Sequence, residues 1–396
     1  MTRLWDKGEP LDERVLRYTA GEDHRLDSRL VPYEVRASIA HAEMLAAQRL
    51  LAADDLAAIR GGLEALGAAH AAGEWQIELA EEDAQTALEE RLAARIGEPA
   101  RRVHLGRSRN DQVLTSLRLY LRDAVETLAA SAESVAVALD ALAAREADTP
   151  LPGYTHSQPA MPSSVPLWAG GFAAALRDDA AGIAGVQRRL DVCPLGSAAG
   201  YGVPLLPLDR EATARALGFT APQEPVTAVQ LSRGKAEAQL LFELALLMQD
   251  LGRLAADVIL FNMAELGYVE LAAELTTGSS IMPQKRNPDV FELVRGRIAT
   301  AQACLHEVLA ITAKLPSGYH RDLQLLKAPL FRGIDLAEET CGVMAHALAG
   351  VRFRRDRIRL DPSLYATEEA YRLVLDEGIP FREAYRRVAA KVHRDR

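Results

Sequence analysis

The sequence predicts an all-α protein with an elongated central bundle of five long helices and smaller helical domains on either side. Ala and Leu are abundant and aromatic residues make up 5% of the 396 residues, a composition that favours helix over strand. Long segments also place apolar residues three or four positions apart, which is the helical period. We expect an N-terminal domain at residues 1–105, the bundle at 106–349 and a short C-terminal domain at 350–396.

The first long helix is predicted between Gly106 and Pro150, where no other Gly or Pro occurs. At 1.5 Å per residue, a helix of ~35 residues would span roughly 50 Å. Its apolar stripe comprises Leu114, Leu117, Leu121, Val125, Leu128, Ala132, Val135, Leu139 and Leu142.

Four similar segments follow, at residues 163–191, 228–267, 290–314 and 323–348. Ala and Leu occupy more than one face of these helices, and a lone bundle would leave that surface exposed. We therefore expect the bundles of several subunits to pack together.

The flanking regions contain shorter helical segments. Residues 350–396 are rich in Arg, with short helices expected around Pro362 and Pro380. Within residues 1–105 the expected breaks lie at Gly21, Pro32, Gly61, Gly73 and Gly97.

Composition limits the function. A net charge of -9 argues against a general nucleic-acid-binding protein. Three widely spaced cysteines, Cys193, Cys304 and Cys341, argue against a disulfide framework or a zinc site and favour a reduced, cytoplasmic protein. The N-terminus has no apolar signal core, and no run reaches the ~18 uninterrupted apolar residues of a membrane helix.

Three segments carry groups suited to removing a proton from carbon. Residues 276–292 hold a Ser-Ser pair after Gly278, followed by Lys285, Asn287 and Glu292 at the start of a helix. The positive end of that helix would lie beside Ser279. A flexible surface loop before a capped helix is the alternative interpretation.

The other two segments border the first long helix. Residues 103–112 contain Ser108, Arg109 and Asn110 at a helix start, where backbone N–H groups and arginine favour an anion. Residues 151–159 form a proline-rich turn that carries Thr155 and His156. A capped helix start with surface arginines, and a turn whose histidine only bonds backbone, are the alternatives.

A further candidate lies at residues 315–327, where Gln324 and Lys327 are three residues apart and so share one helix face. Tyr319 and Arg321 precede them at the turn. A solvated helix start is the alternative for this segment.

Together these segments resemble the signature regions of the fumarase/aspartase superfamily and, within it, the argininosuccinate lyase family. The likeness runs from Leu4-Trp5 to Pro380-Phe-Arg-Glu-Ala384. Residues 106–112 and 151–156 are more specific to that family than to its relatives, residues 194–198 also match it, and residues 278–288 mark the superfamily.

The resemblance implies a homotetramer whose active sites each draw on three chains, and a cofactor-free, metal-free elimination that releases fumarate from argininosuccinate. It implies that Ser279 is the base and that Lys285 and Asn287 stabilise the aci-carboxylate intermediate. Thr155 and His156, oriented by Glu292, would bind substrate or assist the leaving nitrogen. The residues implied to bind substrate are Ser108, Arg109, Asn110, Gln284, Tyr319, Gln324 and Lys327.

Four departures indicate a divergent branch of the family. Gly21 and Gln85 replace an expected serine and histidine, two residues are inserted before Asp27, and residues 231–235 are altered. The chain also ends soon after Tyr385. Another fumarate-releasing carbon–nitrogen lyase with a different amine remains an alternative, as does a non-catalytic, crystallin-like helical scaffold.

Overall fold

The computed structural model describes residues 12–394, so Leu4-Trp5 lies outside the described residues. The chain forms two compact units. Unit 1 comprises the residues up to Ala129, Gly182–Ala245 and Thr300–Leu336; unit 2 comprises Ala130–Ala181, Leu246–Ala299 and the residues from Ala337 onward. The three-domain division at 105/106 and 349/350 remains a prediction.

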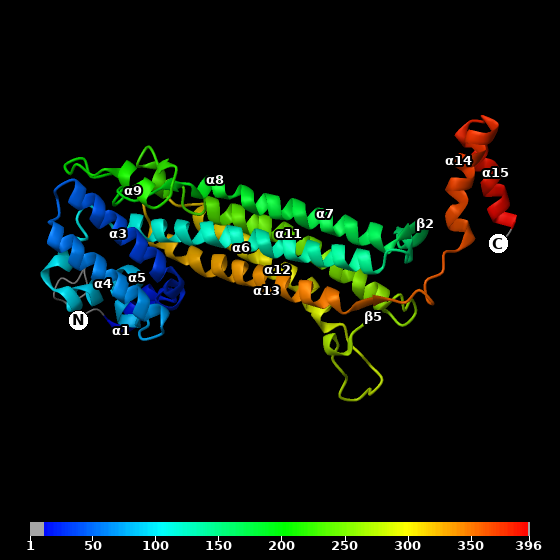
Figure 1. Cartoon of the computed structure of the whole chain (residues 1–396), viewed down its shortest axis with the longest axis horizontal. Helices are drawn as coiled ribbons and strands as arrows, with labels where there is room; N and C mark the ends of the chain where they lie inside the picture. The colour runs from blue at the N-terminus through cyan, green and yellow to red at the C-terminus, as the bar shows by residue number, and fades with distance from the viewer. Residues whose placement is uncertain (1–11, 395–396) are drawn as a thin grey trace. The chain divides into compact units, whose positions relative to one another are not determined.

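The all-α class and the five long helices are confirmed (Figure 1). The nine residues of the apolar stripe in the first of them are each at most 2% exposed. The helical period of the sequence therefore identified the buried face of this helix correctly. The five helices are α6 (Arg109–Arg145), α7 (Val165–Gly185), α11 (Lys235–Asn262), α12 (Asp289–Thr312) and α13 (Lys327–Ala349).

Two of the predicted helices are shorter than expected. The segment 163–191 divides into α7 and α8 (Gln187–Leu190), and the segment 228–267 divides into α10 (Ala228–Leu231) and α11. Gly234, with a φ of +82°, separates α10 from α11, because a left-handed residue cannot continue a right-handed helix.

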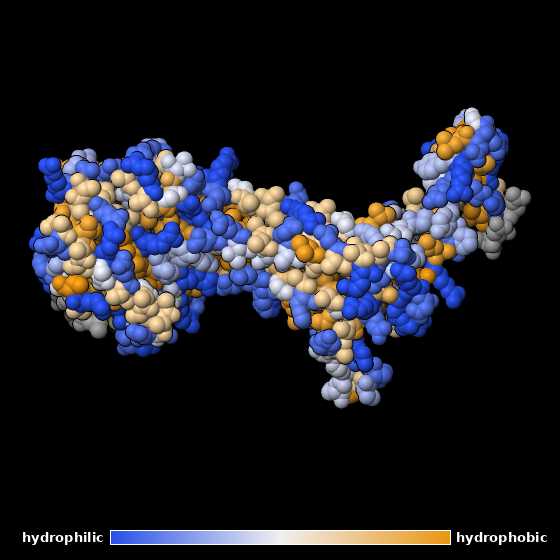
Figure 2. All heavy atoms as spheres, in the orientation of Figure 1, coloured by the Kyte–Doolittle hydropathy of each residue, from blue (hydrophilic) through white to orange (hydrophobic). Residues whose placement is uncertain are grey.

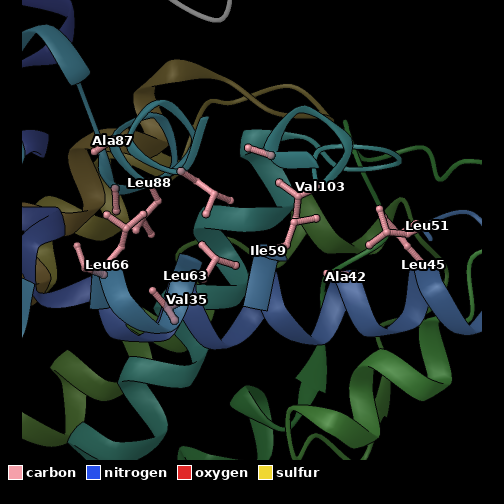
Figure 3. Packing of buried hydrophobic residues seen from close by; sticks show 14 of the residues in the cluster. Val35, Ala42, Leu45, Leu51, Ile59, Leu63, Leu66, Ala87, Leu88 and Val103 are labelled. Atoms are coloured by element: carbon pink, nitrogen blue, oxygen red, sulfur yellow. The ribbon is translucent and has the colours of Figure 1, made fainter. Parts of the chain in front are cut away.

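The N-terminal part of unit 1 packs short helices around an apolar core (Figure 3). In this core, Val35 and Leu45 of α3 meet Ile59 and Leu63 of α4 and Leu88 of α5. The elements are α1 (Glu13–Ala20), α2 (Asp23–Leu26), η1 (Asp27–Leu30), α3 (Val31–Ala47), α4 (Ala53–Ala71), η2 (Leu79–Glu81), α5 (Ala84–Ile96) and η3 (Glu98–Arg102).

The predicted breaks in this region are correct at three glycines and wrong at a fourth. Gly21, Gly73 and Gly97 have positive φ and lie just beyond helix ends. Gly61 instead lies inside α4, because a single glycine costs a helix only ~1 kcal/mol relative to alanine and packing offsets that cost. Pro32 is the second residue of α3, a position in the first turn that tolerates proline.

Short strands supplement the helices, and the sequence interpretation missed them. In unit 1, β3 (Val192–Cys193) pairs with β4 (Ala221–Pro222), and α9 (Arg210–Ala216) lies between them in the chain. In unit 2, β1 (Pro150–Thr155) and β2 (Gln158–Ser164) form an antiparallel hairpin, and β5 (Val269–Leu271) pairs with β6 (Val351–Phe353).

An aromatic cluster anchors α7 in unit 2. The Trp168 ring lies edge-on to Phe261 and Phe353, and its indole N–H donates to Asp257 at 2.9 Å. Three short elements complete the chain around Pro362 and Pro380, as predicted: η6 (Pro362–Tyr365), α14 (Ala366–Glu377) and α15 (Phe381–Arg394).

Candidate active site

A cavity of about 140 Å³ lies in unit 1. Five of the predicted substrate-binding residues, contributed by segments more than 200 residues apart, line it: Arg109, Asn110, Tyr319, Gln324 and Lys327.

Lys327 forms a buried cluster with two carboxylates. It is the first residue of α13, and its side chain is 2% exposed. Its ammonium bonds to Asp27 and lies 2.9 Å from Asp23. Burial opposes its charge, but the two carboxylates outweigh this effect and raise the pKa of Lys327. Lys327 is therefore a permanent cation fixed in the cavity wall.

Arg109 is also held by carboxylates. Its guanidinium pairs with Asp83 and lies 3.4 Å from Glu82. These partners raise the pKa of Arg109 even though burial lowers it. A ligand carboxylate would therefore share Arg109 with two resident acids.

The segment that precedes α6 is fixed by Asp111, which the sequence interpretation had placed at the start of the helix without a role in the site. Its carboxylate accepts backbone N–H groups from Ser108 at 2.9 Å, Gly196 at 2.9 Å and Ala198 at 2.7 Å. Burial nevertheless raises the pKa of Asp111 to about 6. Asp111 thus ties the 194–198 loop to the helix start that carries Ser108 and Asn110.

The sequence interpretation also missed other groups of the cavity wall. Arg233 donates through Nη2 to the Leu323 carbonyl at 3.2 Å, and its Nε and Nη1 have no partner among the residues that the structure describes. Gln85 donates to Glu34 at 3.2 Å, while its own side-chain oxygen is buried and has no hydrogen-bond partner within residues 12–394. The residues that line the cavity and were not among the predicted site residues are Asp23, Asp83, Gln85, Val113, Arg233 and Arg321.

Unit 2 presents His156 at the tip of the β1–β2 hairpin. His156 and Ser157 have φ values of +51° and +57°, the pattern of a two-residue turn with both central residues left-handed. Such a φ is uncommon outside glycine and often marks functional positions. Thr155 and His156 are both exposed.

The 276–287 loop of unit 2 carries the serine pair. Its ends are joined by backbone hydrogen bonds between Thr277 and Asn287 at 2.8 and 3.2 Å. The Ser279 hydroxyl oxygen accepts the backbone N–H of Met282 at 3.2 Å and that of Ile281 at 3.4 Å. Hydrogen bonds donated to an oxygen favour its charged form, so this loop geometry suits a serine that must lose its proton.

The rest of this loop is open to solvent. Gln284 and Lys285 are exposed, as is Glu292 in the first turn of α12, and Ile281 is 82% exposed. In the described part of the chain, no hydrogen bond or ion pair joins the hairpin tip to the loop. The helix begins at Asp289, just after Pro288.

The predicted site residues therefore fall into two sets. Those of unit 1 are Ser108, Arg109, Asn110, Tyr319, Gln324 and Lys327; those of unit 2 are Thr155, His156, Ser279, Gln284, Lys285, Asn287 and Glu292. Among the described residues, no group of three or more His, Cys, Asp and Glu side chains is arranged to hold a metal ion. Cys193, Cys304 and Cys341 are buried and free.

Known structures share this fold. A variant of EDDS lyase with bound fumarate matches with a TM-score of 0.80 and 26% identity, over 97% of this chain and 76% of that chain. A class II fumarase from Schistosoma mansoni matches with a TM-score of 0.77 and 19% identity, over 94% and 91% of the two chains. The second likeness concerns the fold alone.

Sequence comparisons are more specific. A family profile described as "Lyase" matches residues 12–302. The argininosuccinate lyase of Sorangium cellulosum is 49% identical over 98% of this chain and 90% of its own length. That of Thermotoga neapolitana is 39% identical over 100% of this chain and 99% of its own length. The chain therefore belongs to the argininosuccinate lyase family of the fumarase/aspartase superfamily, and it is a carbon–nitrogen lyase.

Proposed function

We propose that this chain catalyses the β-elimination of argininosuccinate to arginine and fumarate, a step of arginine biosynthesis. The observation that carries the proposal is the 49% identity to an argininosuccinate lyase over 98% of the chain. The cavity of unit 1 supports it, because it combines cations with carboxylates, as a substrate with both charges requires.

In this reaction Ser279 acts as its alkoxide, a form favoured by the positive end of α12 and by Lys285, and its oxygen removes the proton from the carbon beside a succinyl carboxylate. The electron pair forms the aci-carboxylate, to which Lys285 and Asn287 donate; each such donor contributes roughly 3–4 kcal/mol by analogy with oxyanion holes. Collapse of this intermediate forms the double bond of fumarate and breaks the carbon–nitrogen bond. The two hydrogen bonds accepted by Ser279 support its role as base.

The remaining predicted residues have binding and proton-transfer roles. Thr155 and His156, with Glu292 orienting the imidazole, bind the substrate or assist protonation of the leaving guanidino nitrogen. Ser108, Arg109 and Asn110 hold the succinyl carboxylates. Further substrate contacts come from Gln284, Tyr319, Gln324 and Lys327.

We further propose a homotetramer in which each active site is shared between chains. Exposed apolar side chains on the long helices support this, because such surface is typical of subunit interfaces. Leu293 and Leu309 of α12 are 62% and 50% exposed, and Val137 of α6 is 54% exposed. Figure 2 shows hydrophobic residues among the hydrophilic ones on the visible face. The exposed loop around Ile281 is a second surface that a neighbouring chain could cover.

We also propose that the protein acts in the cytoplasm on a small molecule, without nucleic acid, a membrane, a metal or a cofactor. Within the described residues, α6 is long and apolar enough by composition to cross a membrane. The buried core helix of a bundle has the same composition, and the stripe of α6 is buried. The acidic net charge of -9 supports the absence of a nucleic-acid partner.

The test is an assay of the purified full chain with argininosuccinate, followed by fumarate absorbance. We expect fumarate and arginine in equal amounts. No fumarate from argininosuccinate, together with fumarate from another N-succinyl amine, would favour the second candidate, a lyase for a different amine. Gly21 and Gln85 motivate that candidate, because Gly21 lies beside Gln324 and Gln85 lines the cavity.

A further inference from the structure

The cavity wall of unit 1 contains a negative charge that its own cation does not neutralise. Asp23 and Asp27 share a single lysine, Lys327. Asp27 is fully enclosed, and its second oxygen accepts the backbone N–H of Ala84 at 3.3 Å. Asp23 lines the cavity, whereas Asp27 does not. The surplus negative charge of the cluster is therefore presented to the cavity through Asp23.

The same cavity contains a cation with unsatisfied hydrogen-bond donors. Arg233 is 5% exposed, and its Nε and Nη1 have no partner among the described residues. Buried donors of a cation are unfavourable unless a ligand supplies acceptors for them. Arg233 thus indicates, independently of the carboxylates, that an anionic group binds here. One cavity with unsatisfied groups of both signs fits a zwitterionic ligand.

Building on the proposed function, we propose that Asp23 is a specificity-determining residue that binds the α-ammonium group at the arginine end of the substrate. The α-carboxylate on the same carbon would lie toward Arg233. Asp23 and Arg233 both line this cavity.

The ionisation of Asp23 agrees with this role. Burial raises the pKa of Asp23 to about 7, and the neighbouring Asp27 and Asp83 raise it further while Lys327 lowers it. These groups face Asp23 from η1, from the residue before α5 and from α13. An incoming ammonium would favour the charged carboxylate and so offset the cost of its burial.

The test uses the reverse reaction, in which the guanidino N–H adds across the double bond of fumarate. Fumarate consumption is followed with arginine and with its α-hydroxy analogue, which lacks only the ammonium. We expect Asp23→Asn to lower kcat/KM for arginine at least ~10-fold, mainly through KM, because a charge-assisted hydrogen bond is lost. The same variant should change kcat/KM for the α-hydroxy analogue less than ~3-fold.

Controls separate recognition from folding. Glu22→Gln removes a neighbouring charge from an exposed side chain that pairs with Arg25, and it should leave both substrates unaffected. Asp23→Glu should recover part of the preference for arginine. Equal losses with both substrates, or no loss with either, would overturn the role of Asp23. Failure of the wild type to split argininosuccinate would instead overturn the proposed function, and this inference with it.

Discussion

The cavity of unit 1 and the 276–287 loop of unit 2 carry different parts of the predicted chemistry, and they differ in how their charges are held. Lys327 is buried against two carboxylates. Lys285 is exposed, and in the described part of the chain it has no ion pair. The comparison indicates that the fold itself fixes the binding groups, whereas the reacting groups depend on further contacts. Such a division agrees with the proposed sharing of active sites between chains.

The largest effect should come from the loop. Replacing Ser279 with Ala removes the proposed base, and we expect kcat for argininosuccinate to fall ~10²–10⁴-fold, the usual contribution of a positioned base. Because Ser279 is only half-buried and bonds to its own loop, the thermal midpoint should not change.

The neighbouring Ser280 provides the matched control. It is exposed and has the same chemistry, so Ser280→Ala should retain most of the activity. If Ser280→Ala were the inactive variant and Ser279→Ala the active one, the base would have to be reassigned to Ser280.

The next effect concerns stability. Here a substitution in the cavity of unit 1 should have the larger effect, and a substitution in the loop of unit 2 the smaller one. Lys327→Met would leave Asp23 and Asp27 buried without a cation, which we expect to lower the free energy of unfolding at pH 7 by about 3–5 kcal/mol. Lys285→Met, in the exposed loop, should change it by less than ~0.5 kcal/mol. Urea unfolding at one fixed protein concentration measures both, and equal losses would contradict the comparison.

A smaller effect should appear as a pH dependence. Because the pKa of Asp23 is raised to about 7 by burial, its negative form is about tenfold scarcer at pH 6 than at pH 8. We expect kcat/KM for arginine to rise over that interval in the wild type and to rise less in Asp23→Asn. Asp27, Asp83 and Lys327 also face this carboxyl and are present in both proteins, so the difference isolates Asp23.

The free energy of unfolding should change with pH in the opposite direction to kcat/KM. A carboxyl whose pKa is raised on folding contributes stability below its unfolded pKa of ~4, and this contribution is lost as the pH rises through the folded value. The free energy of unfolding of the wild type should therefore fall more between pH 4 and pH 8 than that of Asp23→Asn. A parallel pH profile in the two proteins would show that Asp23 does not titrate in this range.

These two regions also differ in what the sequence could predict. The helices were predictable because a buried face imposes spacings of three and four, as in α6. The 276–287 loop was recognisable because its reactive residues are adjacent in the chain. The full cavity was not, because Asp23, Asp83 and Arg233 come together only through tertiary packing. The two-residue insertion before Asp27 was the one feature of the sequence that pointed to Asp23. Nothing in the sequence indicated that Nε and Nη1 of Arg233 would lack hydrogen-bond partners.

The last comparison uses two glycines, one in the helix bundle of unit 1 and one in the 276–287 loop of unit 2. A Cβ on Gly333 of α13 would lie 2.3 Å from Cδ2 of Leu241 in α11, whereas a Cβ on Gly278 would meet nothing within 4 Å. Gly333→Ala should therefore cost about 1–3 kcal/mol in the free energy of unfolding, because the two helices must shift or Leu241 must change rotamer. Gly278→Ala has no such steric cost, and any effect on kcat would come from stiffening the loop beside Ser279. The opposite result would be a neutral Gly333→Ala and a destabilising Gly278→Ala. It would mean that the packed bundle adapts to an added methyl group whereas the loop does not. That would contradict the difference between the two regions expected from Lys327 and Lys285.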